Sequence, residues 1–380
     1  MKIVIAPDSF KGSNSSMAVA ARIENGIRKV FKDAEIVKIP TADGGEGTVE
    51  ALVSTGGECF VERVTGPLGE CVDAIYGILT NGIGVIEMAA ASGLPLVPKD
   101  KRNPLNTTTY GVGELIKAAM DRGCKTILLG LGGSATNDGG VGMAQALGIS
   151  FKDLNGMELG FGGAAIENLA TIDMIGIDLR IKDVDIVIAS DVNSPLCGRE
   201  GASAIFGPQK GADRAMVAKL DANLAHLANV TKTQLGVCMA DISGAGAAGG
   251  LGYGLMAFCG AQMKPGVEVV LDCVDFDKYL QHCNLVITGE GKIDGQSVFG
   301  KVPVGVAQRA KKYNLPVLAI VGDIGEGAAA VYDCGVDSIM SSVNRAMPLE
   351  QAIANGGDLL DEAAERAMRI VKIGLQIGAH

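Results

Sequence analysis

The chain has no tryptophan, few other aromatic residues and only three histidines. Phenylalanine and tyrosine together make up 4% of its 380 residues. His380 is the last residue, so only two histidines are internal. His226 falls in a helix predicted over residues 220–228, and His282 directly precedes a predicted strand, so both are expected to be structural. A His-based catalytic triad or a histidine-rich metal centre is therefore not expected.

Cysteine pairs and long apolar runs are missing as well. The nine cysteines lie far apart, form no Cys-x-x-Cys pair and mostly sit in apolar segments, which favours reduced core residues over a disulfide framework or a zinc site. The apolar run before Pro7 is too short for the hydrophobic region of a signal peptide, and no apolar run reaches the roughly 18 residues of a membrane span. We expect a soluble, cytoplasmic protein that does not insert into membranes.

Positive charge is scarce. The chain carries 33 Lys and Arg residues against 43 Asp and Glu residues, for a net charge of −10, and shows no basic stripe interleaved with aromatic residues. Nucleic acid is therefore not an expected partner.

Glycine and aliphatic residues are abundant instead. The 54 glycines and the many aliphatic runs predict buried parallel strands joined by tight turns, as in α/β enzymes. A chain of 380 residues exceeds the size at which one core usually suffices, so two domains are expected.

The order of the predicted elements indicates a discontinuous domain with an insertion. Strands and helices alternate at both ends, which predicts that residues 1–63 and 284–380 form one Rossmann-like, doubly wound domain. Residues 64–283 then form an inserted α/β domain. Active sites of such chains commonly lie at the carboxyl ends of strands, so we expect the active site in the cleft between the two domains.

The inserted domain is predicted to hold a mixed sheet. Strands predicted over 72–79 and 84–88 flank Asn81 and Gly82, and Asn-Gly is the strongest short signal for a hairpin. Further strands are predicted over residues 126–130, 185–189 and 267–271. The antiparallel hairpin beside buried strands of this kind favours a mixed sheet.

The most informative segment is the loop over residues 130–140, which follows a predicted buried strand. It reads Gly-Leu-Gly-Gly-Ser-Ala-Thr-Asn-Asp-Gly-Gly. Glycines let backbone N–H groups approach a ligand closely, and hydroxyl and amide side chains add polar groups for anionic oxygens. The candidate anion-binding residues of this loop are Gly132, Gly133, Ser134, Thr136 and Asn137. The segment predicts an enzyme that handles phosphate.

Four further loops rich in small residues carry carboxylates and cations. They cover residues 8–12, 41–47, 190–196 and 288–297. Phosphoryl transfer needs a carboxylate for the attacking hydroxyl, carboxylates for magnesium and a cation near the moving phosphoryl group. The acidic residues of the five loops are Asp8, Asp43, Glu46, Asp138, Asp191, Glu290 and Asp294, with Lys11 and Lys292 beside them. This inventory favours a kinase.

Two segments imitate nucleotide fingerprints without being expected to act as such. Residues 295–301 have the spacing of a P-loop, but Val302 stands where a Ser or Thr would contact magnesium. Residues 244–254 match a dinucleotide-binding pattern, but they are glycine-rich throughout and are predicted to form a close-packed turn.

Two alternatives to a kinase stay open at this point. Gly130, Gly132 and Ala135 match the start of a dinucleotide-binding loop, with Asp153 at a suitable distance to hold a ribose, which would suit an NAD-dependent dehydrogenase of a small hydroxy acid. A non-catalytic sensor of a small anionic metabolite would use the same loops for binding only.

The loops together resemble the bacterial glycerate kinase family, which phosphorylates the 2-hydroxyl of glycerate. The similar segments follow one another along nearly the whole chain, over residues 5–12, 40–48, 130–140, 190–196, 206–212, 244–254 and 288–297. One departure is Asn193-Ser-Pro-Leu, where the family has Asn-Pro-Leu, so the local turn is left open. The resemblance implies that ATP and D-glycerate give ADP and 2-phosphoglycerate, with magnesium, on two α/β domains.

Chemistry suggests roles for the charged residues of these loops. We expect Lys11 to neutralise the glycerate carboxylate or the transferring phosphoryl group. Either Asp191 or Asp294 is expected to accept the hydroxyl proton.

The remaining candidates would bind magnesium, substrate or phosphate. Asp43, Glu46 or Glu290 is expected to help hold magnesium. Further contacts to substrate or phosphate are expected from Ser9, Asn193 and Lys292. The small-molecule substrate is the expected partner, and a homodimer is one option for the oligomeric state.

Overall fold

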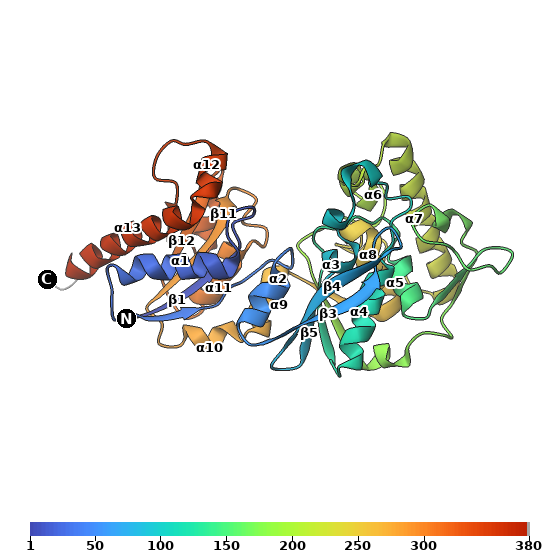
Figure 1. Ribbon diagram of the computed structural model, residues 1–380, viewed down its shortest axis with the longest axis horizontal. Coiled ribbons are helices and arrows are strands. Elements are labelled where there is room, and N and C mark those ends of the chain that lie inside the picture. The colour runs from blue at the N-terminus through green and yellow to red at the C-terminus, as the bar shows by residue number, and fades with distance from the viewer. Residues whose placement is uncertain (378–380) are drawn as a thin grey trace. The chain divides into compact units, whose positions relative to one another are not determined.

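A computed structural model describes residues 1–377 as two compact units, each built on its own sheet (Figure 1). The first unit comprises Met1–Asp43, Glu50–Thr55 and the chain from Pro265 onward, and the second comprises Gly44–Val49 and Gly56–Lys264. The predicted boundaries at residues 63 and 283 therefore differ from those of the structure. Residues 57–65 pair with the second sheet, and residues 265–283 fold with the first unit.

The sheet of the first unit is parallel and has five strands in the order β13-β12-β11-β1-β2. The strands are β1 (Lys2–Pro7), β2 (Glu35–Lys38), β11 (Leu285–Ile293), β12 (Val317–Ile324) and β13 (Ser338–Ser341). Ile3, Val4 and Ile5 are fully buried, because helices cover both faces of the sheet. The order of the strands reverses between β1 and β11, as in the doubly wound sheets whose ligands bind at that point.

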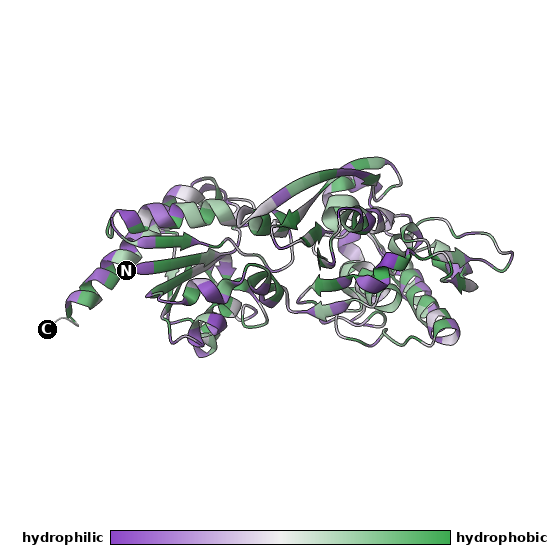
Figure 2. Cartoon of the chain, turned by 90° about the horizontal axis from the view of Figure 1, so that it is seen from below, coloured by the Kyte–Doolittle hydropathy of each residue, from purple (hydrophilic) through white to green (hydrophobic). Residues whose placement is uncertain are grey.

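Helices on both faces complete the first unit. They are α1 (Ser16–Arg28), α9 (Gly266–Cys273), α10 (Phe276–Leu280), α11 (Val302–Lys311), α12 (Leu349–Ala354) and α13 (Gly356–Ile377). Helices α1 and α13 pack on each other and share a core with Ile3 and Ile287. Hydrophilic and hydrophobic residues alternate along α13, as expected for a helix with one buried face (Figure 2). Helix α11 packs against β1, β11 and β12 from the other face.

One strand prediction in this region is wrong. Residues 267–271 belong to helix α9, in which Val267, Val270 and Leu271 are buried at helical spacing. A Cβ at Gly305 of α11 would lie 2.5 Å from Val267 Cγ1, so the two helices pack closely at this glycine. Because a short apolar run fits a buried strand and a buried helix face equally well, only this packing decides between them.

The sheet of the second unit is mixed, as predicted, with the strand order β10-β9-β6-β5-β4-β3. The strands are β3 (Gly57–Thr65), β4 (Cys71–Leu79), β5 (Ile83–Glu87), β6 (Thr126–Gly130), β9 (Asp185–Ala189) and β10 (Gln262–Lys264). Strands β4 and β5 form the predicted hairpin, whose turn places Gly82 at a φ of 81°. A separate antiparallel pair consists of β7 (Ser150–Lys152) and β8 (Thr171–Asp173).

Two glycine-rich segments, residues 130–140 and 244–254, pack against each other among the helices of the second unit. The helices are α3 (Ala89–Ser92), α4 (Tyr110–Asp121), α5 (Val141–Ala146), α6 (Ala202–Phe206), α7 (Arg214–Leu235) and α8 (Ala247–Cys259), while α2 (Thr48–Ser54) crosses from the second unit to the first. A Cβ at Gly249 would collide with the carbonyl oxygen of Thr136, and one at Gly254 would lie 2.8 Å from Gly140 Cα. Residues 244–254 are thus close-packed against the 130–140 loop, as predicted, but residues 247–254 belong to helix α8 and do not form a turn.

Candidate active site

In the first unit, the reversal of strand order brings two polar loops together. Asp8 follows β1 directly, and its backbone N–H donates to the carbonyl oxygen of Gly289 in β11 at 2.8 Å. Glu290 follows Gly289 within β11 and projects from the same edge of the sheet. A Cβ at Gly289 would collide with the carbonyl oxygen of Ile320, so glycine keeps the strands close here. The sheet thus places two carboxylates from distant parts of the chain beside each other.

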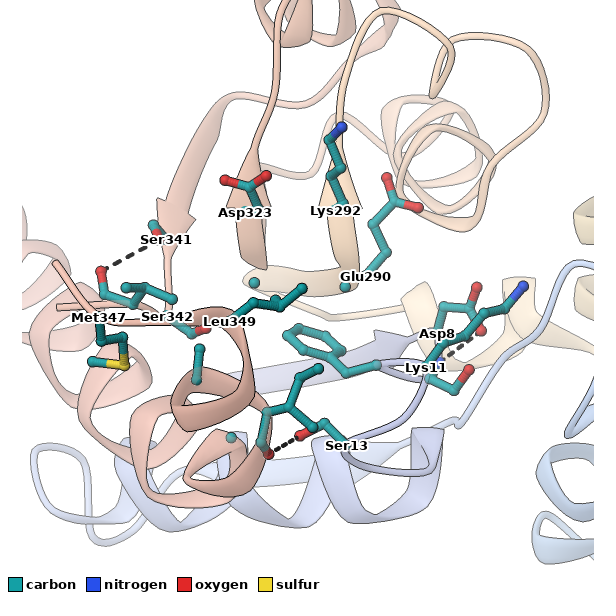
Figure 3. Close-up of a pocket in the computed structure, with 18 of the residues that line it drawn as sticks. Asp8, Lys11, Ser13, Glu290, Lys292, Asp323, Ser341, Ser342, Met347 and Leu349 are labelled. Carbon is teal, nitrogen blue, oxygen red and sulfur yellow. Dashed lines mark hydrogen bonds between the residues drawn. The ribbon is translucent and has the colours of Figure 1, made fainter. Parts of the chain in front are cut away.

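A cavity of about 880 Å³ opens at this edge and is lined only by residues of the first unit. Its charged end carries Asp8, Lys11, Asp43, Glu290 and Lys301. Figure 3 shows Asp8, Lys11 and Glu290 on one side of the cavity and Met347 and Leu349 on the opposite side. The cavity falls in the usual size range of small-molecule sites, about 300–1,000 Å³.

Among the carboxylates of the cavity, Asp8 has the pKa that is shifted furthest from its ordinary value. Its pKa is raised to about 7, chiefly because burial disfavours the charged form and also because of the negative charge of Asp43. The backbone N–H of Ser9 donates to Asp8 Oδ1 at 2.6 Å, and this bond with the nearby Lys11 opposes the rise. A carboxylate with a pKa near neutrality in a cavity is suited to accept and release a proton. No role was predicted for Asp8 from the sequence, since nothing in its loop indicates burial beside two other carboxylates.

The carboxylate of Glu290 contacts two other side chains, those of Ser297 and Lys301. Its side chain is buried, accepts a hydrogen bond from Ser297 Oγ at 2.8 Å and lies 3.5 Å from Lys301 Nζ. Burial raises the pKa of Glu290, while Lys301 and Ser297 counteract that rise. Lys301 occupies the N-cap position of α11, so the positive end of this helix faces the same region.

The other predicted residues of the first unit lie at or near the cavity. Ser9 and Lys11 line it from the loop after β1, and Lys292 lines it from the end of β11. Asp294 is not among the lining residues: its Oδ1 accepts the backbone N–H of Gln296 at 3.0 Å, and its Oδ2 lies 3.5 Å from Lys292 Nζ. The hydrogen bond from Gln296 is the main reason why the pKa of Asp294 is lowered. Asp294 thus closes its own turn in this structure.

In the second unit, the 130–140 loop turns most of its polar side chains inward. Gly132 and Gly133 are exposed, and Ser134 keeps 8% of its surface. Thr136 and Asn137 have no exposed surface. Asn137 Oδ1 accepts a hydrogen bond from Ser203 Oγ at 3.2 Å. Only the corner from Gly132 to Ser134 is therefore placed to contact a ligand.

A buried lysine, Lys210, to which no role was assigned from the sequence, contacts this loop from the interior. Lys210 is 1% exposed, and its Nζ donates to Ser134 Oγ at 2.7 Å and to the carbonyl oxygen of Thr136 at 2.6 Å. Burial lowers the pKa of Lys210 to about 7, against the opposing effect of Asp138. Lys210 follows Phe206-Gly-Pro-Gln, in which no pattern indicates a buried cation.

Asp138 belongs to the same interior network. It is 1% exposed and accepts the backbone N–H and the hydroxyl of Thr109, both within 3.1 Å, and the backbone N–H groups of Gly140 and Gly142. Burial raises its pKa and these hydrogen bonds lower it. The carboxylate thus holds the start of α5 against the start of α4.

Three predicted residues of the second unit lie outside this network. Glu46 is exposed, and its charge contributes to the raised pKa of Glu87, whose Oε1 accepts the backbone N–H of Val49. Asp191 is half-buried after the end of β9. Asn193 is exposed, and its Oδ1 accepts Ser243 Oγ at 2.9 Å.

Comparison with known proteins identifies the family. A sequence model of the glycerate kinase family matches residues 3–372. The chain belongs to the glycerate kinase family. It is 50% identical over 375 residues to the glycerate kinase of Bacillus subtilis (strain 168), and this alignment covers 98% of each chain. It is 50% identical over 378 residues to the glycerate 2-kinase of Escherichia coli (strain K12), which covers 99% of each chain.

The likeness extends to the structure. The crystal structure of a Salmonella typhimurium LT2 protein assigned as glycerate kinase 2 is similar, with a TM-score of 0.90, 47% sequence identity and 99% of both chains covered. The predicted α/β fold class is thereby confirmed.

Membership of the glycerate kinase family removes the dehydrogenase and the sensor as interpretations. The structure agrees at the residue that a dehydrogenase would need, because Asp153 Oδ1 accepts the backbone N–H groups of Asn155 and Met157 and so holds its own turn. None of the helices within residues 1–377 is long and apolar enough to cross a membrane.

No three His, Cys, Asp or Glu side chains within residues 1–377 lie close enough together to hold a metal ion. The three predicted magnesium ligands lie in different units. Asp43 and Glu290 line the cavity of the first unit, and Glu46 belongs to the second. Magnesium is usually bound through one or two carboxylates together with substrate phosphates, so a kinase does not need a protein site of three ligands. Asp43 and Glu290 fit this requirement.

Proposed function

We propose that this member of the glycerate kinase family transfers the γ-phosphoryl group of ATP to the 2-hydroxyl of D-glycerate, giving 2-phosphoglycerate and ADP. The full-length similarity to a glycerate 2-kinase carries the proposal. The carboxylates and lysines of the first unit's cavity support it, because they are the groups that phosphoryl transfer requires.

Asp8 is the proposed acceptor of the hydroxyl proton. It lies at the reversal of strand order, lines the cavity and has a pKa raised to about 7, so it can bind a proton and release it near neutral pH. In this role it replaces Asp294, whose carboxylate closes a turn outside the lining of the cavity. Asp191 stays a second candidate from the other unit.

Lys11 is proposed to neutralise charge on the substrate carboxylate or on the transferring phosphoryl group. It is exposed, lines the cavity and lies in the same loop as Asp8. Lys292 and Lys301 line the cavity from β11 and from the start of α11, where they would hold the phosphates of the nucleotide. The hydroxyl of Ser9, which also lines the cavity, would contact the substrate or a phosphate group.

Asp43 and Glu290 are the proposed protein ligands of magnesium. The bound ion would neutralise the negative charge of the nucleotide phosphates. Glu290 is already held in place by Ser297 and Lys301. Glu46, in the second unit, is a further proposed magnesium ligand. In the same unit, Gly132, Gly133 and Ser134 form the accessible corner of the 130–140 loop.

We place the reaction in the cytoplasm. The cysteines within residues 1–377 form no disulfide, which suits a reducing compartment.

Product analysis tests the proposal. The protein is incubated with magnesium, ATP and D-glycerate, and the products are identified by phosphorus NMR. We expect 2-phosphoglycerate in an amount equal to the ADP formed. A product that is only 3-phosphoglycerate, or a reaction that consumes no ATP, would refute the proposal.

A further inference from the structure

The cavity of the first unit has an apolar end that the proposed roles of its charged residues leave unused. The loop after β13 and helix α12 form this end with Val343, Met347, Leu349 and Ile353, and Asn344 and Arg345 of the same loop also line the cavity. Leu349 is 74% exposed and lines the cavity together with the other three. In Figure 3, Met347 and Leu349 lie on the side of the cavity opposite Asp8 and Lys11. The exposed apolar surface therefore belongs to the cavity.

Several contacts fix this apolar end in place. Ser13 Oγ donates to the carbonyl oxygen of Ile353 at 2.8 Å, which ties α12 to the loop after β1. The backbone N–H of Ser342 donates to the carbonyl oxygen of Val321 at 2.7 Å and anchors the loop after β13. A Cβ at Gly356 would collide with Ser13 Oγ, so a larger residue there would push the wall outward. These contacts hold the loop after β13 and helix α12 against the rest of the first unit.

The two ends of the cavity select the kind of ligand. One end offers the cations Lys11, Lys292 and Lys301, and the other offers mainly apolar side chains, with Arg345 beside them. A ligand that satisfies both ends carries anionic groups at one end and an uncharged, mostly apolar group at the other. D-Glycerate, with three carbon atoms and a carboxylate, has no group for the apolar end, whereas a nucleoside triphosphate has both parts.

We infer that the cavity of the first unit is the nucleotide site, with the nucleoside against Leu349 and Ile353 and the phosphates toward Lys11, Lys292 and Lys301. This inference rests on the proposed function for the identity of the nucleotide. It assigns the nucleotide to one unit, which the family similarity alone does not do.

A charge placed on the apolar wall tests the inference. Leu349→Asp puts a carboxylate against the nucleoside, and Leu179→Asp is the matched control because Leu179 is 67% exposed and lies in the second unit. The probe is adenylyl imidodiphosphate with magnesium, titrated by calorimetry so that no turnover is needed. We expect Leu349→Asp to weaken binding about tenfold or more and Leu179→Asp to leave it unchanged, because a desolvated carboxylate beside an apolar group is unfavourable. Wild-type affinity in Leu349→Asp would overturn the inference.

Two further measurements separate this inference from the proposed function. The KM for D-glycerate at saturating ATP should stay within about twofold of wild type in Leu349→Asp, because only nucleotide contacts change. Hydrogen exchange on the wild-type protein should show that adenylyl imidodiphosphate protects backbone amides of residues 341–354; protection confined to the second unit would overturn the inference without any variant. If the nucleotide binds and protects this segment but D-glycerate is not phosphorylated, the proposed function fails and the nucleotide site stands.

Discussion

The loop after β1 in the first unit and the loop after β6 in the second unit share a sequence style but differ in what they do with their polar side chains. Both follow buried parallel strands and both combine glycine with hydroxyl and acidic residues. The first turns Asp8 and Lys11 toward a cavity, while the second buries Thr136, Asn137 and Asp138. The difference arises from what packs on each loop: residues 244–254 and Lys210 cover the second. A glycine-rich polar loop after a strand can thus either present side chains to a cavity or bury them in hydrogen bonds within the core.

The largest expected effect comes from Asp8, the carboxylate that the first loop presents to the cavity. Asp8→Asn keeps the size of the side chain but removes its capacity to accept a proton. We expect kcat to fall about 100-fold or more, within the range that a general base contributes. Asp294→Asn is the matched control and should change kcat only slightly, because that carboxylate holds its own turn. Comparable losses in both variants would contradict the assignment of the base.

Lys11 tests the same loop through its positive charge. Lys11→Met should lower kcat/KM about 100-fold, because the developing negative charge loses a partner. Lys278→Met, at a lysine of helix α10 whose side chain is 55% exposed, serves as the control. Near wild-type turnover by Lys11→Met would place this lysine outside the reacting groups.

Lys210 tests the second loop through stability. Lys210→Met leaves Ser134 Oγ and the carbonyl oxygen of Thr136 without their donor, at a cost of about 1–3 kcal/mol in the free energy of unfolding. Urea unfolding at pH 9 measures this cost. Lys219→Met, at an exposed lysine of the same unit, should change the free energy of unfolding little. An unchanged free energy in Lys210→Met would show that the loop does not depend on this lysine.

The pH dependence of that free energy sharpens the test. The pKa of Lys210 is lowered to about 7 in the folded protein and is near 10.4 in the unfolded chain, so the unfolded state binds more protons between these values. Lys210 therefore makes folding more favourable as pH rises from about 7 to about 10, and its charged form is a penalty below pH 7. The difference between wild type and Lys210→Met should grow from pH 7 to pH 9. A difference that shrinks over this interval would contradict the lowered pKa.

The smallest expected effect concerns one glycine in each loop. Gly12 and Gly133 both have left-handed φ angles, of 78° and 73°. A Cβ at Gly12 meets nothing within 4 Å, whereas one at Gly133 lies 3.3 Å from Ala89 Cβ. Gly12→Ala should cost about 1 kcal/mol from backbone strain alone, and Gly133→Ala should cost somewhat more. Thermal unfolding of both variants compares them, and a smaller loss for Gly133→Ala would contradict the tighter packing of the second loop.

Local patterns predicted most of the fold. The Asn81-Gly82 pair predicted the hairpin of β4 and β5, because this signal lies within a few residues. The helix at residues 266–273 was missed because its apolar face packs on α11, which is distant in the sequence. The first boundary was misplaced because the pairing partner of β3 decides its sheet.

The candidate site was predictable only as a set of loops. Ser9, Lys11, Asp43, Glu290 and Lys292 do line one cavity, and their residue types had indicated phosphate chemistry. The role of Asp8 depends on burial beside carboxylates that are 35 and 282 positions away in a folded sheet, and no local pattern reports that. The inward direction of Thr136 and Asn137 depends in the same way on the glycines at residues 249–254.

The pH dependence of kcat/KM for D-glycerate tests the central claim that Asp8 is the base. At low concentrations of both substrates this quantity reports the free enzyme. Asp8 must be ionised to accept a proton and has a pKa raised to about 7, so kcat/KM of the wild type should fall about tenfold per pH unit below pH 7. The residual activity of Asp8→Asn should lack this fall. A wild-type profile that stays flat from pH 5.5 to pH 8, or the same fall in Asp8→Asn, would contradict the account.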